Sequence, residues 1–115
     1  MPIPPVSELL KKHCTPIAPG TPPQDESAVR ERLRDLPGWQ LADNEIAKTY
    51  NFKNYYETLA FVNATAFISH HEDHHPDLEV GYNKCRVRYS THSVGGLSEN
   101  DLICAARVDA LIDRS

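Results

Sequence analysis

Histidines and carboxylates are concentrated in one short stretch of this chain, the run from His70 to His75 that precedes Pro76. The run holds four of the six histidines together with two carboxylates. Histidine can accept and donate a proton near neutral pH, because its unperturbed pKa lies there. His92 and Asp101 follow further along the chain, nine residues apart. These residue types predict either general acid–base chemistry or a transition-metal site.

Metal binding is the first alternative, because residues 71–75 match the HExxH zinc pattern. That pattern needs both histidines on one uninterrupted helix, whereas Pro76 disfavours helix at the residue before it. We therefore expect no functional metal. Histidines near the end of a helix are also favoured electrostatically without having any function. This simpler explanation suffices for His70 and His71 taken singly, and acid–base chemistry explains His74, His75 and His92 better.

Composition sets the class of protein. The chain has 115 residues, of which 40% are hydrophobic and 24% charged, as expected for one globular domain. Its net charge of -4 argues against a nucleic-acid surface, which would normally be basic. No apolar run is long enough to span a bilayer, and the first residues do not resemble a signal peptide. The three widely spaced cysteines fit a reducing cytoplasm, where we expect the protein to act.

Residues 1–25 hold seven of the nine prolines. Proline fixes φ and removes a backbone donor, so this composition predicts a Pro-rich N-terminal arm. At most one or two helical turns are expected in it, between Ser7 and His13. Hydrophobic periodicity begins after the arm, and we place a single domain at residues 26–115. The arm could lie along this domain or along a partner subunit.

Three helices are predicted from caps and hydrophobic periodicity, over about residues 25–36, 54–73 and 98–112. The second begins at Asn54, with Glu57 placed as in a capping box. We expect it to end near the histidines because of Pro76. The apolar side chains Leu59, Val62, Ala66 and Phe67 are expected on one side of it.

Short alternating segments between the helices predict four strands, near residues 39–41, 46–52, 78–80 and 85–89. Lys48 departs from clean alternation, since it falls among the apolar positions of the second strand. The element order is helix, two strands, long helix, two strands, helix. This order predicts an α+β fold in which a four-stranded antiparallel sheet has three helices packed on one face. The Pro-rich N-terminal arm precedes it.

Seven short segments are shared with one known family: LPGW at 36–39, YNFK at 50–53, FVN at 61–63, DHHPD at 73–77, YNK at 82–84, STH at 90–92 and GGLSEND at 95–101. Over residues 26–112 the sequence resembles the pterin-4a-carbinolamine dehydratases. These are also known as dimerisation cofactors of a homeodomain transcription factor. The spacing from the HHP element to the STH element to the acid is the most specific part. The Pro-rich arm resembles, more loosely, the extension of longer bacterial members.

The resemblance implies a lyase that removes water from a 4a-hydroxytetrahydropterin such as 4a-hydroxytetrahydrobiopterin. The product is the quinonoid dihydropterin, which recycles the cofactor of aromatic amino acid hydroxylases. No cofactor or metal is implied. The expected partners are the pterin substrate, a hydroxylase in the same pathway, and further copies of the chain. Family members form homodimers through sheet edges and homotetramers through their long helices. Neither nucleic acid nor a membrane is expected. The alternative is a non-catalytic protein-binding module, or transcriptional cofactor, of the same fold.

Carried over residue by residue, the resemblance assigns catalysis to His74, His75, His92 and Asp101. His74 and His92 form the acid–base pair, and His75 orients the substrate. Asp101 is equally explained as a helix-capping acid, and the two roles can coexist. The substrate-binding residues implied are Asp73, His74, His75, Pro76, Ser90, Thr91, His92, Ser93 and Trp39.

Three positions need comment. Trp39 is explained either as a core anchor or as a pocket wall. His70 stands where many members of the family have an acid, and Asn100 where animal members have a basic residue. We expect the first difference to affect the pH optimum and the second to affect contacts at the pocket rim.

Overall fold

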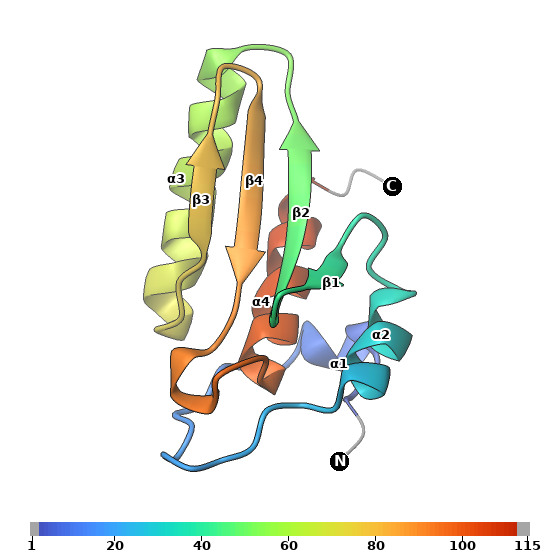
Figure 1. Ribbon diagram of the computed structural model, residues 1–115. Helices are drawn as coiled ribbons and strands as arrows, with labels where there is room; N and C mark the ends of the chain where they lie inside the picture. The colour runs from blue at the N-terminus through green and yellow to red at the C-terminus, as the bar shows by residue number, and fades with distance from the viewer. Residues whose placement is uncertain (1–2, 113–115) are drawn as a thin grey trace.

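The computed structural model describes residues 3–112 and contains one four-stranded antiparallel sheet (Figure 1). The strand order is β1-β2-β4-β3, so β2 and β4 lie in the centre and β1 and β3 at the edges. The strands are β1 (Gln40–Ala42), β2 (Glu45–Asn51), β3 (Asp77–Val80) and β4 (Lys84–Tyr89). The predicted α+β fold with a four-stranded antiparallel sheet is confirmed.

The two long helices lie behind the sheet in the view of Figure 1 and pack against each other. They are α3 (Tyr55–Glu72) and α4 (Glu99–Ile112). Three shorter elements, α1 (Val6–Leu9), α2 (Glu26–Leu33) and the 3-10 turn η1 (His92–Val94), complete the described chain. Within residues 3–112, no helix has the length and apolar character needed to cross a membrane.

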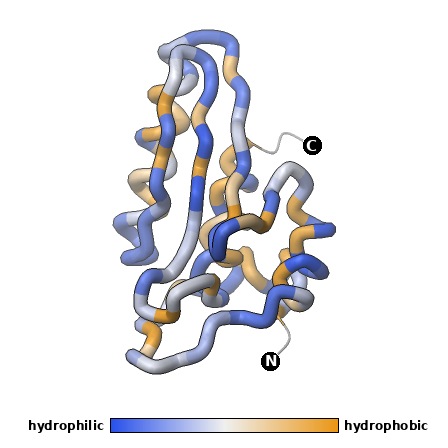
Figure 2. The backbone as a smooth tube through the Cα atoms, viewed as in Figure 1, coloured by the Kyte–Doolittle hydropathy of each residue, from blue (hydrophilic) through white to orange (hydrophobic). Residues whose placement is uncertain are grey.

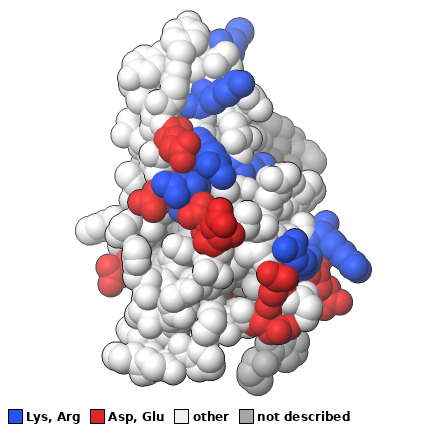
Figure 3. All heavy atoms as spheres, viewed as in Figure 1, with Lys and Arg blue, Asp and Glu red and all other residues white. Residues whose placement is uncertain are grey.

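Alternation along β4 gives the sheet one buried and one exposed face, and can be followed in Figure 2. Cys85, Val87 and Tyr89 are completely buried. The arginines between them lie on the exposed face, where Arg88 pairs with Glu45 at 3.2 Å and with Glu79 at 3.0 Å. Acidic and basic side chains are therefore interspersed on this face (Figure 3).

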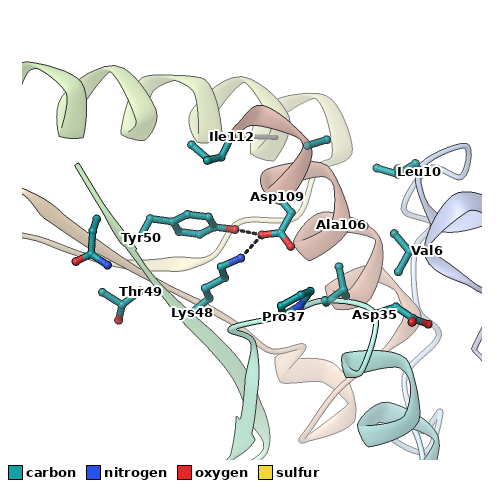
Figure 4. A pocket seen from close by; sticks show the side chains of 13 residues that line it. Val6, Leu10, Asp35, Pro37, Lys48, Thr49, Tyr50, Ala106, Asp109 and Ile112 are labelled. Carbon is teal, nitrogen blue, oxygen red and sulfur yellow. Dashed lines mark hydrogen bonds and ion pairs between the residues drawn. The ribbon is translucent and has the colours of Figure 1, made fainter. Parts of the chain in front are cut away.

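Lys48, which departs from the alternating pattern of β2, has a partner on the buried side. Its Nζ lies 2.9 Å from Oδ1 of Asp109, which also accepts from the hydroxyl of Tyr50 (Figure 4). The indole N–H of Trp39 donates to the same oxygen at 3.1 Å. A lysine is tolerated here because a carboxylate on α4 compensates its charge.

Helix α3 begins as predicted, since the Asn54 side chain accepts from the backbone N–H of Glu57 at 2.9 Å. The side expected to carry apolar residues is not the most deeply buried side of the helix, however. Leu59 and Phe67 are exposed by 37% and 72%, whereas the buried positions are Thr58, Phe61, Thr65, Ile68 and Glu72. Thr58 and Thr65 can be buried because their hydroxyls donate to backbone carbonyls at 2.7–3.0 Å.

The N-terminal segment, residues 3–24, packs on the domain in two places. Ile3 and Leu9 are part of the hydrophobic core, and α1 packs against α4. The following residues run past η1 to α2, as the blue trace in Figure 1 shows. At the end of this path, the backbone N–H of Gln24 donates to the carbonyl of Leu97 at 2.8 Å.

Candidate active site

His74 is placed by the way in which α3 ends. Asp73 adopts a left-handed conformation, with φ 52° and ψ 43°, and so turns the chain out of the helix. The backbone N–H of His74 then donates to the carbonyl of Ser69 at 3.1 Å, and that of Asp73 donates to His70. These two bonds form a Schellman motif, which fixes the backbone on both sides of the turn. His74 therefore has a defined position although it lies outside the helix.

Asp101, in the first turn of α4, holds the ring of His74. Its Oδ1 lies 2.6 Å from Nε2 of His74, and its Oδ2 accepts from the hydroxyl of Thr91 at 2.8 Å. The backbone N–H of Ser98 also donates to Oδ2, at 3.0 Å. Asp101 is completely buried, so these donors replace the water that its carboxylate gives up. Asp101 therefore makes the helix-capping contact that the sequence suggested and, in addition, contacts His74.

The Asp101 contact decides which ring nitrogen of His74 is available. A buried carboxylate accepts only, so Nε2 carries a hydrogen and donates to it. Nδ1 is left with a lone pair in the neutral ring. The ring also stacks on Tyr89, with centroids 5.8 Å apart and planes inclined by 14°. The His74 side chain is 14% exposed, so one part of it still reaches solvent. Such a group can take a proton from a bound molecule and return it.

A cavity of about 220 Å³ borders His74 and contains several residues that the sequence assigned to the site. These are Asp73, His74, Thr91 and Ser93. The cavity is also lined by Glu72, Asn100 and four consecutive residues of the N-terminal segment, Cys14 to Ile17. Asn100 was expected at the pocket rim, whereas the other five residues were not predicted from the sequence.

The other residues predicted for the site do not line the cavity beside His74. His75 and Pro76 line a second cavity, of about 410 Å³, together with His70 on the outer side of α3. Ser90 is half-buried where β4 ends, and His92 is exposed at the start of η1, next to Ser93. Trp39 is buried in the cluster around Asp109 and lines neither cavity.

A larger cavity, of about 640 Å³, lies beside that cluster (Figure 4). Apolar side chains from both termini of the described chain line it, including Val6, Leu10 and Ile112. Burial and the carboxylate of Asp109 raise the pKa of Tyr50 above its usual range, so this phenol stays protonated. Lys48, Tyr50 and Asp109, three of the polar residues that line it, are already paired with one another.

The segment that matches HExxH is divided between different surroundings. His71 is exposed and lies near His13 and Phe67, while Glu72 is buried beneath the N-terminal segment. Among residues 3–112, no three side chains of His, Cys, Asp or Glu are grouped so as to hold a metal ion.

Comparison with known proteins identifies the family of this chain. Residues 22–111 match the family model described as pterin 4 alpha carbinolamine dehydratase. The chain belongs to this family. A protein of Nitrosomonas eutropha, whose name proposes it as a pterin-4-alpha-carbinolamine dehydratase, is 56% identical over 108 residues. That alignment covers 93% of this chain and 96% of the relative. A protein of the same name from Nitrosomonas europaea is 57% identical over 107 residues, covering 92% and 95%.

Two solved structures are also similar. A transcriptional coactivator/pterin dehydratase from Brucella melitensis superposes with a TM-score of 0.75 at 32% identity, covering 79% of this chain and 99% of that one. A pterin dehydratase-like protein identified as a RuBisCO assembly factor in the alpha-carboxysome gives 0.56 at 28% identity, covering 67% and 89%. The family resemblance predicted from the sequence is confirmed.

Proposed function

We propose that this dehydratase family member removes water from a 4a-hydroxytetrahydropterin and forms the quinonoid dihydropterin. The observation that carries the proposal is the contact between His74 and the buried Asp101 at the edge of the cavity. Family membership supplies the class of substrate. The product would be reduced again and returned to an aromatic amino acid hydroxylase.

The chemistry requires two proton transfers. A base removes the hydrogen of N5, and the electrons of that N–H bond form the C4a=N5 double bond. The C4a–O bond breaks at the same time, and an acid protonates the departing hydroxyl to give water. Each such transfer by a positioned side chain contributes typically about 10²–10⁴-fold in rate.

We assign the base to His74 and the acid to His92. His74 suits the first role because Asp101 occupies Nε2 and leaves the Nδ1 lone pair for the substrate. Asp101 also stabilises the imidazolium that forms when the proton is taken. His92 is exposed and adjoins the cavity residue Ser93. From this position its side chain would reach the hydroxyl group on the other side of the pterin ring. His75 and Pro76 would support the part of the pterin that extends toward the second cavity.

Self-association of the chain is part of the proposal. The edge strands β1 and β3 have unpaired sides along which a second sheet can add. One side of α3 exposes large apolar side chains, which a helix of a second copy would cover. They are Tyr55, Tyr56, Leu59 and Phe67. We propose a homodimer or homotetramer formed through these surfaces.

The test is the dehydration of freshly generated 4a-hydroxytetrahydropterin, followed by ultraviolet absorbance with and without the protein. We expect acceleration that a metal chelator leaves unchanged. If the protein leaves the rate at its uncatalysed value, the dehydratase proposal is wrong. The protein-binding alternative would then take its place; the names of both similar solved structures suggest such a role for those proteins.

A further inference from the structure

Glu72 is a buried acid at the end of a helix where an acid is unfavourable. It is the last residue of α3, and the negative end of the helix dipole lies there. Its side chain is only 2% exposed. Its surroundings therefore have to compensate for lost water and for the helix dipole together.

The N-terminal segment supplies most of that compensation. Oε1 of Glu72 accepts from the backbone N–H of Cys14 at 2.7 Å, and Oε2 contacts Nδ1 of His13 at 2.8 Å. Arg107 of α4 lies 3.7 Å from the same Oε2. Burial alone would raise the pKa of Glu72, but these donors outweigh it and hold the pKa below its usual range. Glu72 is thus an anion that the segment and α4 share.

Asn100 holds the next residue of the segment by a reciprocal pair of hydrogen bonds. Its side-chain oxygen accepts from the N–H of Thr15 at 3.1 Å, and its side-chain nitrogen donates to the carbonyl of Thr15 at 2.8 Å. Asn100 is itself buried. The Sγ atoms of Cys14 and Cys104 lie 3.5 Å apart and add a third contact.

The anchoring residues adjoin the site in the sequence. Glu72 comes two residues before His74, and Asn100 immediately precedes Asp101. Between these anchors, residues 14–17 line the same cavity as His74. The segment therefore closes one side of the site and connects the ends of α3 and α4.

The chemistry of the substrate indicates what such a wall would contact. In a pterin, C6 is bonded directly to N5, the atom from which the base takes its proton. A substituent on C6 must then leave the ring close to His74. The cavity, at about 220 Å³, is smaller than the roughly 300–1,000 Å³ typical of pockets that enclose a drug-sized ligand. Once the pterin ring occupies this cavity, little volume remains for the substituent at C6.

We propose that residues 14–17 form a specificity-determining wall that selects pterins by their substituent at C6. Glu72 and Asn100 are the positioning residues that hold this wall. Ile17, which is half-buried at the cavity, supplies the apolar surface nearest to the substituent. The inference rests on the proposed function, since it assumes a pterin beside His74.

The experiment measures kcat/KM for two 4a-hydroxytetrahydropterins that carry either a methyl group or a dihydroxypropyl chain at C6. We expect Ile17→Ala and Glu72→Gln to change the ratio of the two values by roughly tenfold, mainly through KM. Leu10→Ala and Glu31→Gln are the matched controls. Leu10 belongs to the same segment but lines the distant large cavity, and Glu31 is an exposed acid of α2. Both should keep the wild-type ratio.

A second measurement reports whether the N-terminal segment is packed against the domain. Cys14 is half-buried, whereas the other two cysteines are buried, so alkylation followed by intact mass reports on Cys14. We expect Glu72→Gln to alkylate faster than the wild type.

If Glu72→Gln is alkylated faster but keeps the wild-type ratio of kcat/KM values for the two pterins, the inference is overturned. An unchanged ratio in Ile17→Ala would overturn it as well. A wild-type chain that dehydrates neither pterin would instead reject the proposed function. If the wild type is active but the variants keep its ratio of kcat/KM values, only the proposed specificity wall is rejected.

Discussion

Replacing Asp101 by asparagine changes a single atom and tests how His74 is held. In the wild type, Oδ1 faces Nε2 of His74 at 2.6 Å, while Oδ2 accepts from Thr91 and from the backbone N–H of Ser98. A backbone N–H can only donate. The asparagine oxygen must therefore take the position of Oδ2. This arrangement turns the NH₂ group toward His74.

Nε2 of His74 must then accept a hydrogen bond, and its proton moves to Nδ1. The nitrogen left for the substrate would carry a hydrogen and could no longer act as a base. Loss of one positioned proton-transfer group costs about 10²–10⁴-fold. We expect kcat of Asp101→Asn to fall by about that factor, with a small change in KM because the shape of the site is kept.

Stability should respond differently from activity. A hydrogen bond to a buried charged group contributes roughly 1.5–3 kcal/mol, so the variant should be less stable but still folded. Asp109→Asn is the matched control. Asp109 lies on the same helix and accepts from Trp39, Lys48 and Tyr50, but it does not line the His74 cavity. It should lose stability and keep its kcat.

Stopped-flow absorbance gives kcat, and ¹⁵N chemical shifts of the imidazole give the position of the proton. We expect a hydrogen on Nε2 in the wild type and on Nδ1 in Asp101→Asn. A folded Asp101→Asn protein with wild-type kcat would refute it. An equal loss of kcat in Asp109→Asn would refute the assignment of the effect to His74.

Three further predictions concern stability, pH and assembly. Phe61 is 5% exposed, and its ring centroid lies 4.7 Å from that of Tyr50 and 5.0 Å from that of Phe52. Phe61→Ala should therefore lower the free energy of unfolding, measured in urea, by roughly 3–5 kcal/mol. A loss below about 1 kcal/mol would contradict this packing. The pKa of Glu72 is depressed below its ordinary 4.5, so its contribution is present above pH 4.5 and is lost as the pH falls through the lower folded value. The difference in unfolding free energy between wild type and Glu72→Gln should therefore shrink on acidification below pH 4.5, and a growing difference would reverse the sign of the argument. Finally, Phe67→Glu, on the exposed side of α3, should lower the mass measured by light scattering; an unchanged oligomer would exclude this side of the helix from the interface.

The sequence predicted the elements of this fold where local rules determine them. Asn54 caps α3 as its spacing to Glu57 indicates, and the helix ends shortly before Pro76. Alternation in residues 85–89 correctly identified the buried side chains of β4. These features depend on residues a few positions apart, so one sequence contains enough information to predict them.

The sequence pattern was less informative where distant residues compensate a polar group. Thr58 was not expected in the core, and its hydroxyl donates to the carbonyl of Tyr82, which is 24 residues away. Lys48 departed from alternation because its partner, Asp109, is 61 residues away. In both cases a contact absent from the local sequence makes burial favourable.

The candidate site shows the same division. The family motifs indicated His74, Thr91 and Asp101, which the structure brings into hydrogen-bonding contact in one network. Glu72 was passed over as part of a chance HExxH match. One signal was available in the sequence, an acid in the last turn of a helix, where the dipole disfavours it. Its partners in residues 13–14 could not be inferred, since proline content says nothing about where a segment packs.

The most direct test of the account compares the wild type with a double variant, His74→Ala and His92→Ala, in the dehydration of 4a-hydroxytetrahydropterin. Circular dichroism and the urea midpoint should show that both proteins are folded. The account predicts strong acceleration by the wild type and the uncatalysed rate with the double variant. A folded double variant that still dehydrates the substrate at the wild-type rate would contradict histidine acid–base catalysis in this protein.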